Sequence, residues 1–393
     1  MKKILLAAAA VALVTQVAAA QTVKIGILLG FTGPEESQAP GIYNGAELAI
    51  KQIDASHAFL KGAQLEGVKG DDTCTDASAA VAAATRLVTS DHVAGIVGGH
   101  CSGVTAAVLQ SVARPNGVVM ISPSATSPSL STAPSDGLFF RTAPSDARQG
   151  QVMADVLIKQ GIKKVALTYT DNDYGKGLAD AFSAAYKKEG GTITISLPHQ
   201  DGKADYSAEV GTLAAAGGQM LVVAGYADQG GKGIIQGALD TGAFSKFYLP
   251  DGMYTASLLQ HFGKSLDGSI GDIGESNSSG FKTFVAEAKK AGFDGTAAYS
   301  AQGYDAVALM ALAMEAAHST KGTVYKNKIE AIANGPGVKI YAGQLAKGLK
   351  LLSEGKAINY EGASSVRLIG PDSAGSYRVY TIKNGKRVTD YYE

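Results

Sequence analysis

The sequence lacks the motifs that mark the common classes of enzyme. Its six histidines never form the H-E-x-x-H spacing of a zinc site, and neither a G-x-S-x-G elbow nor a Walker A loop occurs. Gly231-Lys232-Gly233 is rich in glycine but lacks the full phosphate-binding pattern, so we interpret it as a turn. We find no nucleophile paired with a base beyond the one considered below. The sequence therefore predicts a protein that is not an enzyme and needs no cofactor or metal.

The chain also lacks any excess or cluster of basic residues. Its 393 residues include 35 Lys and Arg against 35 Asp and Glu, a formal net charge of +0. Without a basic patch, nucleic acid is not expected as a partner, and nothing indicates binding to a membrane surface. A hydrophobic content of 46% with 18% charged residues is typical of a globular protein with large cores.

Beyond the N-terminus, no apolar run approaches the roughly 20 residues that a membrane span needs. The first residues have the three parts of a secretory leader: basic Met1–Lys3, apolar Ile4–Val17 and a small-residue site at Ala18–Ala20. Residues 1–20 are therefore predicted to be a signal peptide and Gln21 the first mature residue, which gives an exported, soluble protein. An uncleaved membrane anchor is the alternative.

Only two cysteines occur, Cys74 and Cys101. An oxidising compartment favours joining them, and the loop that the bond would close predicts about 3–4 kcal/mol of stabilisation. His100 precedes Cys101, so a Cys–His nucleophile is the alternative. The disulfide accounts for both cysteines, whereas the nucleophile leaves Cys74 without a role. We therefore expect the disulfide.

Strand and helix patterns alternate along a chain that is long enough for two domains. Buried strands are predicted at 23–29, 95–98, 117–122, 164–170, 192–196, 220–224 and 247–249. Helices are predicted at 44–53, from 76, from 102, and at 149–159, 177–188, 206–216 and 233–241. This alternation is typical of open, mostly parallel sheets, and the number of units favours two doubly wound α/β lobes.

Three loops that follow predicted strands or strand-like segments are rich in small hydroxyl residues: 100–103, 122–126 and 142–146. In open α/β sheets ligands bind at the carboxyl ends of strands, and hydroxyls with free N–H groups at the start of a helix form an anion site. Each Ser or Thr alone is best interpreted as an ordinary cap or turn residue. Three such loops at successive strand ends indicate one shared cleft.

A series of motifs follows in order along the mature chain: Lys69–Asp76, Gly98–Ser102, Met120–Pro128, Arg141–Ala143 with Asp146 and Gln149-Gly150, Asp173–Gly177, Gly225-Tyr226 and Pro250–Gly252. Together they resemble the leucine/isoleucine/valine-binding proteins, which are type I periplasmic substrate-binding proteins of ABC importers. The resemblance covers essentially the whole mature chain. It implies a periplasmic protein that binds a small-molecule ligand and hands it to a membrane permease, and it agrees with the Cys74–Cys101 disulfide. We expect a monomer.

The resemblance also implies how the lobes are built. Two doubly wound parallel-sheet lobes would be joined by a three-segment hinge, with the ligand sealed between them. Residues 21–145 and 275–370 would form the first lobe, and residues 146–274 and 371–393 the second.

The resemblance assigns the ligand's carboxylate end to the first lobe. Ser102 and Thr126 would bind the α-carboxylate through hydroxyl and backbone N–H groups, with the backbone of Ser124 alongside. A zwitterion in a dry cleft needs paired charge and hydrogen-bond donors at both ends, which supports this assignment.

The ligand's ammonium end is assigned to acidic and aromatic residues. Asp146 and Asp251 would face the α-ammonium, although many relatives have the longer Glu where this chain has Asp251. Tyr174 and Tyr226 would form walls of the cleft from the second lobe. For the two tyrosines, packing in the core is the alternative.

One departure from the family pattern bears on specificity. Relatives often place a Tyr where this sequence has Gln38, in the stretch Glu35-Glu36-Ser37-Gln38, which puts specificity for branched aliphatic side chains in doubt. The two carboxylates would face a cationic or polar ligand side chain, or be solvated, and solvation is the favoured interpretation.

Two other functions remain as alternatives to binding an amino acid for import. The ligand could be an aromatic or other small organic carboxylate, or an amide, although ammonium partners at Asp146 and Asp251 argue against a simple acid. The chain could also be a ligand-sensing domain. It ends at Glu393 with no following membrane span, which argues against this alternative.

Overall fold

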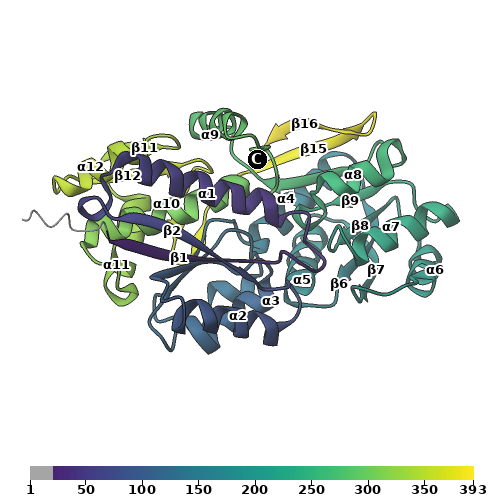
Figure 1. Ribbon diagram of the computed structural model, residues 1–393. Coiled ribbons are helices and arrows are strands. Elements are labelled where there is room, and N and C mark those ends of the chain that lie inside the picture. Colours follow the sequence, from purple (N-terminus) through teal and green to yellow (C-terminus); the bar gives the residue numbers. More distant parts are fainter. Residues whose placement is uncertain (1–20) are drawn as a thin grey trace, which may run out of the picture.

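The computed structural model describes residues 21–393 and arranges them as two α/β lobes side by side (Figure 1). The first sheet has the order β2-β1-β3-β4-β5 and is parallel throughout. Its strands are β1 (Thr22–Leu29), β2 (Gln64–Asp71), β3 (Gly95–Gly98), β4 (Val119–Ser122) and β5 (Phe139–Arg141). The helices between them are α1 (Ala39–Ser56), α2 (Ala77–Thr89) and α3 (Ser102–Val108). The predicted signal peptide, residues 1–20, lies outside the described residues.

The second sheet has the order β16-β15-β10-β9-β8-β6-β7. Five of its strands form a parallel ladder, and the C-terminal hairpin adds β15, which is antiparallel to β10, and β16, which is antiparallel to β15. The strands are β6 (Lys164–Thr170), β7 (Thr192–His199), β8 (Met220–Ala224), β9 (Phe247–Leu249), β10 (Ile270–Gly274), β15 (Tyr377–Lys383) and β16 (Lys386–Tyr392). Its helices are α4 (Asp146–Lys159), α5 (Asp173–Lys188), α6 (Ser207–Ala216), α7 (Gly230–Thr241) and α8 (Ala256–Phe262).

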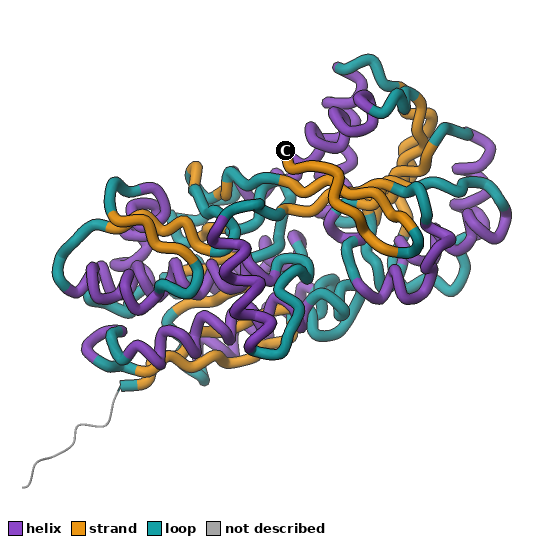
Figure 2. The backbone as a smooth tube through the Cα atoms, turned by 90° about the horizontal axis from the view of Figure 1, so that it is seen from above, coloured by secondary structure: helices purple, strands orange, loops and turns teal. Residues whose placement is uncertain are grey.

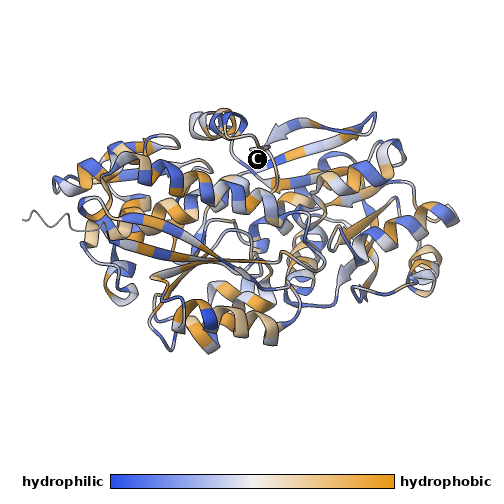
Figure 3. Cartoon of the chain, in the orientation of Figure 1, coloured by the Kyte–Doolittle hydropathy of each residue, from blue (hydrophilic) through white to orange (hydrophobic). Residues whose placement is uncertain are grey.

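After β10 the chain returns to the first lobe. This segment contains α9 (Ser279–Lys290), α10 (Ser300–Ala317), α11 (Gly322–Asn334), α12 (Leu345–Ser353) and the short strands β11 (Val338–Tyr341), β12 (Ile358–Gly362), β13 (Leu368–Ile369) and β14 (Asp372–Ser373). α10 packs against α1, β3 and β4 and is buried from Ser300 to Glu315. It is thus the central helix of this lobe's core, while the surface helices carry both hydrophilic and hydrophobic residues (Figure 3).

The chain passes between the two sheets three times, and the crossing segments are bonded to one another. Pro144 forms a parallel bridge with Ser373. The Glu275 N–H donates to the Ser376 carbonyl at 3.0 Å, and the Ser376 hydroxyl donates back to the Glu275 carbonyl at 3.0 Å. Seen from above, the C-terminal end of the chain lies near the middle of the long dimension of the molecule (Figure 2). The expected three-segment hinge is therefore present, whereas the exact lobe boundaries stay a prediction.

Both sheets have the strand order of a doubly wound fold, so each has one point where the order reverses. In the first sheet that point lies between β1 and β3, and in the second it lies between β6 and β8. Crossover connections leave a crevice at such a point, outside the carboxyl ends of the strands. The fold thus provides two crevices, one in each lobe.

Local sequence explains where several of these helices begin. The Asp76 carboxylate accepts hydrogen bonds from the N–H groups of Ser78 and Ala79, and the Asn172 side chain accepts one from Gly175. Each satisfies N–H groups that the first turn of a helix leaves free, which fixes the start of α2 and of α5.

The elements predicted from the sequence are present, with corrected ends. The strands at 95–98, 164–170, 220–224 and 247–249 match the structure to the residue. Several helices begin earlier than predicted, for example α1 at Ala39 rather than 44, because Pro40 occupies its first turn, where the absent N–H costs nothing. No element had been predicted for β2 or for residues 250–370.

Candidate functional site

The carboxyl ends of the two sheets meet at a small buried cavity of about 20 Å³ between the lobes. The loops after β1 and β3 reach it from the reversal point of the first sheet, and those after β6 and β8 from that of the second. Its lining residues are Glu35, Gln38, His100, Cys101, Ser102, Ser124, Tyr174, Tyr226, Asp251, Gly252 and Tyr299. The two crevices that the strand orders create therefore form one site.

A disulfide and a buried carboxylate fix the loop after β3. Cys74 and Cys101 are bonded to each other, which confirms the predicted disulfide. The Asp72 carboxylate accepts hydrogen bonds from the N–H of Cys74 at 3.0 Å and of His100 at 2.7 Å. Burial raises the pKa of Asp72 to about 7, although both hydrogen bonds oppose this rise.

Serine hydroxyls hold the first-lobe loops against one another. Ser124 donates to the His100 carbonyl at 2.9 Å, and the Ser102 hydroxyl accepts from the N–H of Ser127 at 3.1 Å. Both serines are buried and line the cavity, as the ligand assignment requires. Loops that are bonded in this way hold their remaining donors in place before a ligand arrives.

On the opposite wall, two tyrosines and an aspartate form a connected group. The rings of Tyr174 and Tyr226 are stacked with centroids 5.2 Å apart. The Tyr174 hydroxyl donates to Asp251 Oδ1 at 2.9 Å, and the Tyr299 hydroxyl donates to Asp251 Oδ2 at 2.5 Å. Burial raises the pKa of Asp251, and these hydrogen bonds counteract part of the rise. The tyrosines thus line the cavity and also pack against each other, and their contact with a ligand stays a prediction.

Hydrogen bonds between the lobes show that the cleft is closed in this structure. The Gln38 side chain donates to the Asp251 carbonyl at 3.0 Å, and the N–H of Ser37 donates to the Asp228 carboxylate at 2.9 Å. The N–H of Asp228 donates to the Pro34 carbonyl at 3.2 Å. The loop after β1 is therefore the part of the first lobe that contacts the second.

Asp146 and Thr126 are neighbours but lie outside the lining of the cavity. The N–H of Asp146 donates to the Thr126 carbonyl at 2.9 Å, and both residues are buried. Neither the Asp146 carboxylate nor the Thr126 hydroxyl has a hydrogen-bond partner within residues 21–393. Burial, followed by the nearby Asp251 carboxylate, raises the pKa of Asp146 well above its usual range. Ligand contacts at these two positions stay a prediction.

The expectation that Glu35 and Glu36 are both solvated is wrong for Glu35. Its side chain is only 2% exposed and lines the cavity, whereas Glu36 is exposed. The reason lies in lobe closure, because Glu35 Oε1 accepts a hydrogen bond from the N–H of Ala227 in the second lobe at 3.2 Å. Burial, followed by the nearby Asp228 carboxylate, raises the pKa of Glu35 well above its usual range.

Two further lining residues had not been predicted. His100 was considered only as a partner for Cys101, yet its ring borders the cavity and accepts a hydrogen bond at Nδ1 from Gly30. Tyr299 precedes α10, in a segment where no element had been predicted. A signal existed for His100, since the motif that contains Ser102 begins before it, but none marked Tyr299.

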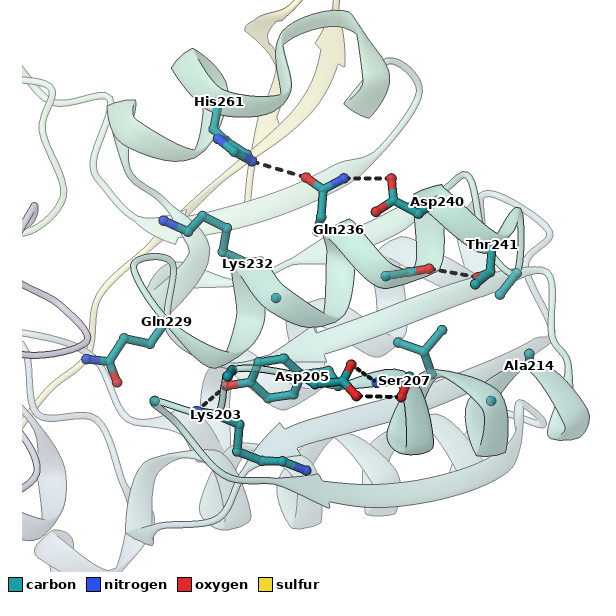
Figure 4. A pocket seen from close by; sticks show the side chains of 18 of the residues that line it. Lys203, Asp205, Ser207, Ala214, Gln229, Lys232, Gln236, Asp240, Thr241 and His261 are labelled. Carbon is teal, nitrogen blue, oxygen red and sulfur yellow. Dashed lines mark hydrogen bonds between the residues drawn. The ribbon is translucent and has the colours of Figure 1, made fainter.

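Larger pockets are not better candidates. A groove of about 840 Å³ lies between α6 and α7, and its polar side chains mostly bond to one another (Figure 4). Gln236 donates to Asp240 at 2.7 Å and bonds to His261 at 3.1 Å, while Asp205 accepts from Ser207. In contrast to the buried cavity, the groove is lined by exposed residues such as Lys203, Asp205 and Ser207.

Two further structural observations concern the described part of the chain. Among residues 21–393, no group of His, Cys, Asp and Glu side chains is arranged to hold a metal ion. The same residues include no helix long and apolar enough to cross a membrane.

The comparisons with known proteins agree with one another. The family described as "Periplasmic binding protein" matches residues 22–343. "Leu/Ile/Val-binding protein" from Escherichia coli K12 is 30% identical over 269 residues, which are 68% of this chain and 72% of that protein. "Leu/Ile/Val-binding protein homolog 3" from Brucella melitensis is 36% identical over 219 residues, but the match spans only 57% of that relative and 54% of this chain.

A solved structure is similar over nearly the whole length. The branched-chain amino acid transporter substrate binding protein from Streptococcus pneumoniae, in complex with isoleucine, superposes with a TM-score of 0.77. It is 25% identical and covers 95% of this chain and 99% of its own. Comparison by sequence and comparison by structure thus find the same kind of protein.

Proposed function

The chain belongs to the periplasmic binding protein family, a family of solute-binding proteins rather than enzymes, and from that premise we propose that it captures an amino acid or amino-acid-like molecule for an ABC importer. The ligand would be held between the lobes and delivered to a membrane permease. We further propose a periplasmic location and a monomer.

The observation that carries this proposal is the pair of crevices that meet in one buried cavity. One wall offers the Ser102 hydroxyl with Ser124 beside it, and the other offers the carboxylate of Asp251. Donors on one side and an acid on the other match the two ends of a zwitterion.

Lobe closure supplies the mechanism. A ligand that contacts Ser102 in the first lobe and Asp251 in the second stabilises the closed state, because only that state offers both contacts. The hydrogen bonds of Gln38 and Ser37 to the second lobe add to closure once it has occurred. An open state would expose the cavity to solvent for entry and release.

A thermal-shift screen of residues 21–393 tests the proposal. The panel contains the common L-amino acids, benzoate and 4-hydroxybenzoate, and short amides. We expect one or more amino acids to raise the melting temperature, since a ligand at 100 times its Kd stabilises the folded state by about 2.7 kcal/mol. Stabilisation by the acids or amides alone would contradict the proposed ligand class, and stabilisation by nothing in the panel would contradict the function.

A further inference from the structure

One oxygen of the buried Glu35 carboxylate accepts a hydrogen bond, and the other does not. Oε1 accepts from the N–H of Ala227, whereas Oε2 has no hydrogen-bond partner within the described residues 21–393. The side chain is 2% exposed and borders the cavity. A buried acceptor without a partner costs about 1–3 kcal/mol, and more when it carries charge, so Glu35 is unfavourable here unless something binds it.

No positive charge on the described protein balances this acid. None of the eleven described residues that line the cavity is a Lys or Arg. The carboxylates of Asp228, Asp251 and Asp201 lie close enough to raise the pKa of Glu35 further, after burial itself. Electrostatically, the site therefore attracts cations.

Glu35 is the second acid of the cavity, and the first already has a role. Asp251 accepts hydrogen bonds from Tyr174 and Tyr299 and is the partner proposed above for the ligand's α-ammonium. An amino acid with an aliphatic side chain brings only that one positive charge. It would leave Glu35 buried beside an apolar group, at the cost of an unpaired charge or of a proton taken up.

We propose that Glu35 pairs with a second positively charged nitrogen on the ligand, so that the protein prefers amino acids with a basic side chain to branched aliphatic ones. This rests on the proposed function. Glu35 belongs to a first-lobe loop that contacts Ala227 of the second lobe, so the closed state buries the carboxylate and shields the pairing from water. Binding of the basic group and closure therefore support each other.

The experiment compares ligands that differ only in the charge. Calorimetry on residues 21–393 measures Kd for L-lysine and L-norleucine, whose side chains have the same carbon chain with and without a terminal ammonium. L-Arginine, L-ornithine, L-glutamine and L-leucine complete the panel. We expect at least one basic amino acid to bind about 30-fold or more tightly than L-norleucine.

Variants then assign the preference to Glu35. Glu35→Gln keeps an acceptor for the Ala227 N–H but removes the charge, and we expect it to reduce the preference for the basic ligand over L-norleucine by tenfold or more. Glu36→Gln is the matched control, because Glu36 is the exposed neighbour, and it should leave both affinities unchanged. If Glu35→Gln does not fold, Glu35→Asp, which keeps the charge but shortens its reach, should lower the same ratio to a smaller extent.

Three outcomes would overturn the proposal. L-Leucine or L-norleucine binding as tightly as every basic amino acid would do so, as would L-glutamine binding more tightly than all of them. An unchanged affinity ratio in a folded Glu35→Gln protein would also do so. In each case an amino acid still binds, so the proposed function stands. Binding of no amino acid at all would instead contradict that function.

Discussion

The two walls of the cavity are built in different ways. On the first-lobe wall, Ser102, Ser124 and His100 belong to loops fixed by a disulfide and by hydrogen bonds within the same lobe. On the second-lobe wall, Asp251 is held by Tyr174 from its own lobe and by Tyr299 from the other. The serine loops of the first wall are therefore held in place before closure, whereas the second wall is completed by it. If the proposed ligand contacts form, we therefore expect the carboxylate end to dock first and the ammonium end to secure the closed state.

The largest effect is expected from the acid of the second wall. Asp251→Asn keeps the size of the side chain but leaves a buried ligand ammonium without a charged partner. We expect Kd for the best ligand of the panel to rise about 1000-fold, or about 4 kcal/mol. Calorimetry measures it, and Asp240→Asn on the surface groove serves as the control. A Kd within threefold of the unmodified protein would show that Asp251 is not the ammonium partner.

The next effect concerns the rigidity of the first wall. Cys74→Ser removes the bond to Cys101, which spans 27 positions of the sequence. We expect the free energy of unfolding to fall by about 3–4 kcal/mol, measured by urea denaturation under oxidising conditions. If the first wall also needs the bond to hold Ser102 in place, ligand affinity falls as well. A change below about 1 kcal/mol, with reductant having no effect on the unmodified protein, would contradict the structural role.

The residues that line the cavity also differ in whether the sequence can predict them. Strand-end positions such as Ser102, Tyr174 and Tyr226 follow from the alternation of strands and helices, because the carboxyl ends of parallel strands share one edge. The burial of Glu35 depends instead on a bond to Ala227, 192 positions away, which forms only when the lobes meet. No local pattern contains that information.

Two elements, α10 and β2, could not be predicted from the sequence for a different reason. α10 is buried on nearly all of its faces, so its apolar residues show no helical periodicity that would set it apart. β2 is only half buried and contains two glycines, which weakens the pattern that marks a strand. The sequence therefore gives α10 no periodic pattern and gives β2 only a weak one.

The stability of the protein should depend on pH through His199 of the second lobe. Burial lowers the pKa of His199, which bonds to Thr168, to about 4. In the unfolded chain the ring takes up a proton below its usual value of about 6.5, so the unfolded state is favoured as pH falls from about 6.5 to about 4. Compared with His199→Gln, which does not titrate, the unmodified protein should lose about 2–3 kcal/mol more over this range. Parallel pH profiles for the two proteins would show that the ring is protonated in the folded state.

The smallest effect is expected from a single hydroxyl of the first wall. Ser102→Ala removes one proposed donor to the ligand carboxylate and also the acceptor of the Ser127 N–H. The neighbouring donors and the loop framework remain, because Ser124 and the disulfide hold the loop independently. We therefore expect Kd to rise about tenfold, against about 1000-fold for the acid of the opposite wall.

Ser129→Ala is the control, since Ser129 bonds to Ser127 but does not line the cavity. If the first wall docks the ligand before closure, as we expect, the substitution weakens binding to the open and the closed state alike. Small-angle scattering at saturating ligand should then still show the compact form. A variant that binds tightly but no longer closes would reverse the order of docking that the two walls indicate.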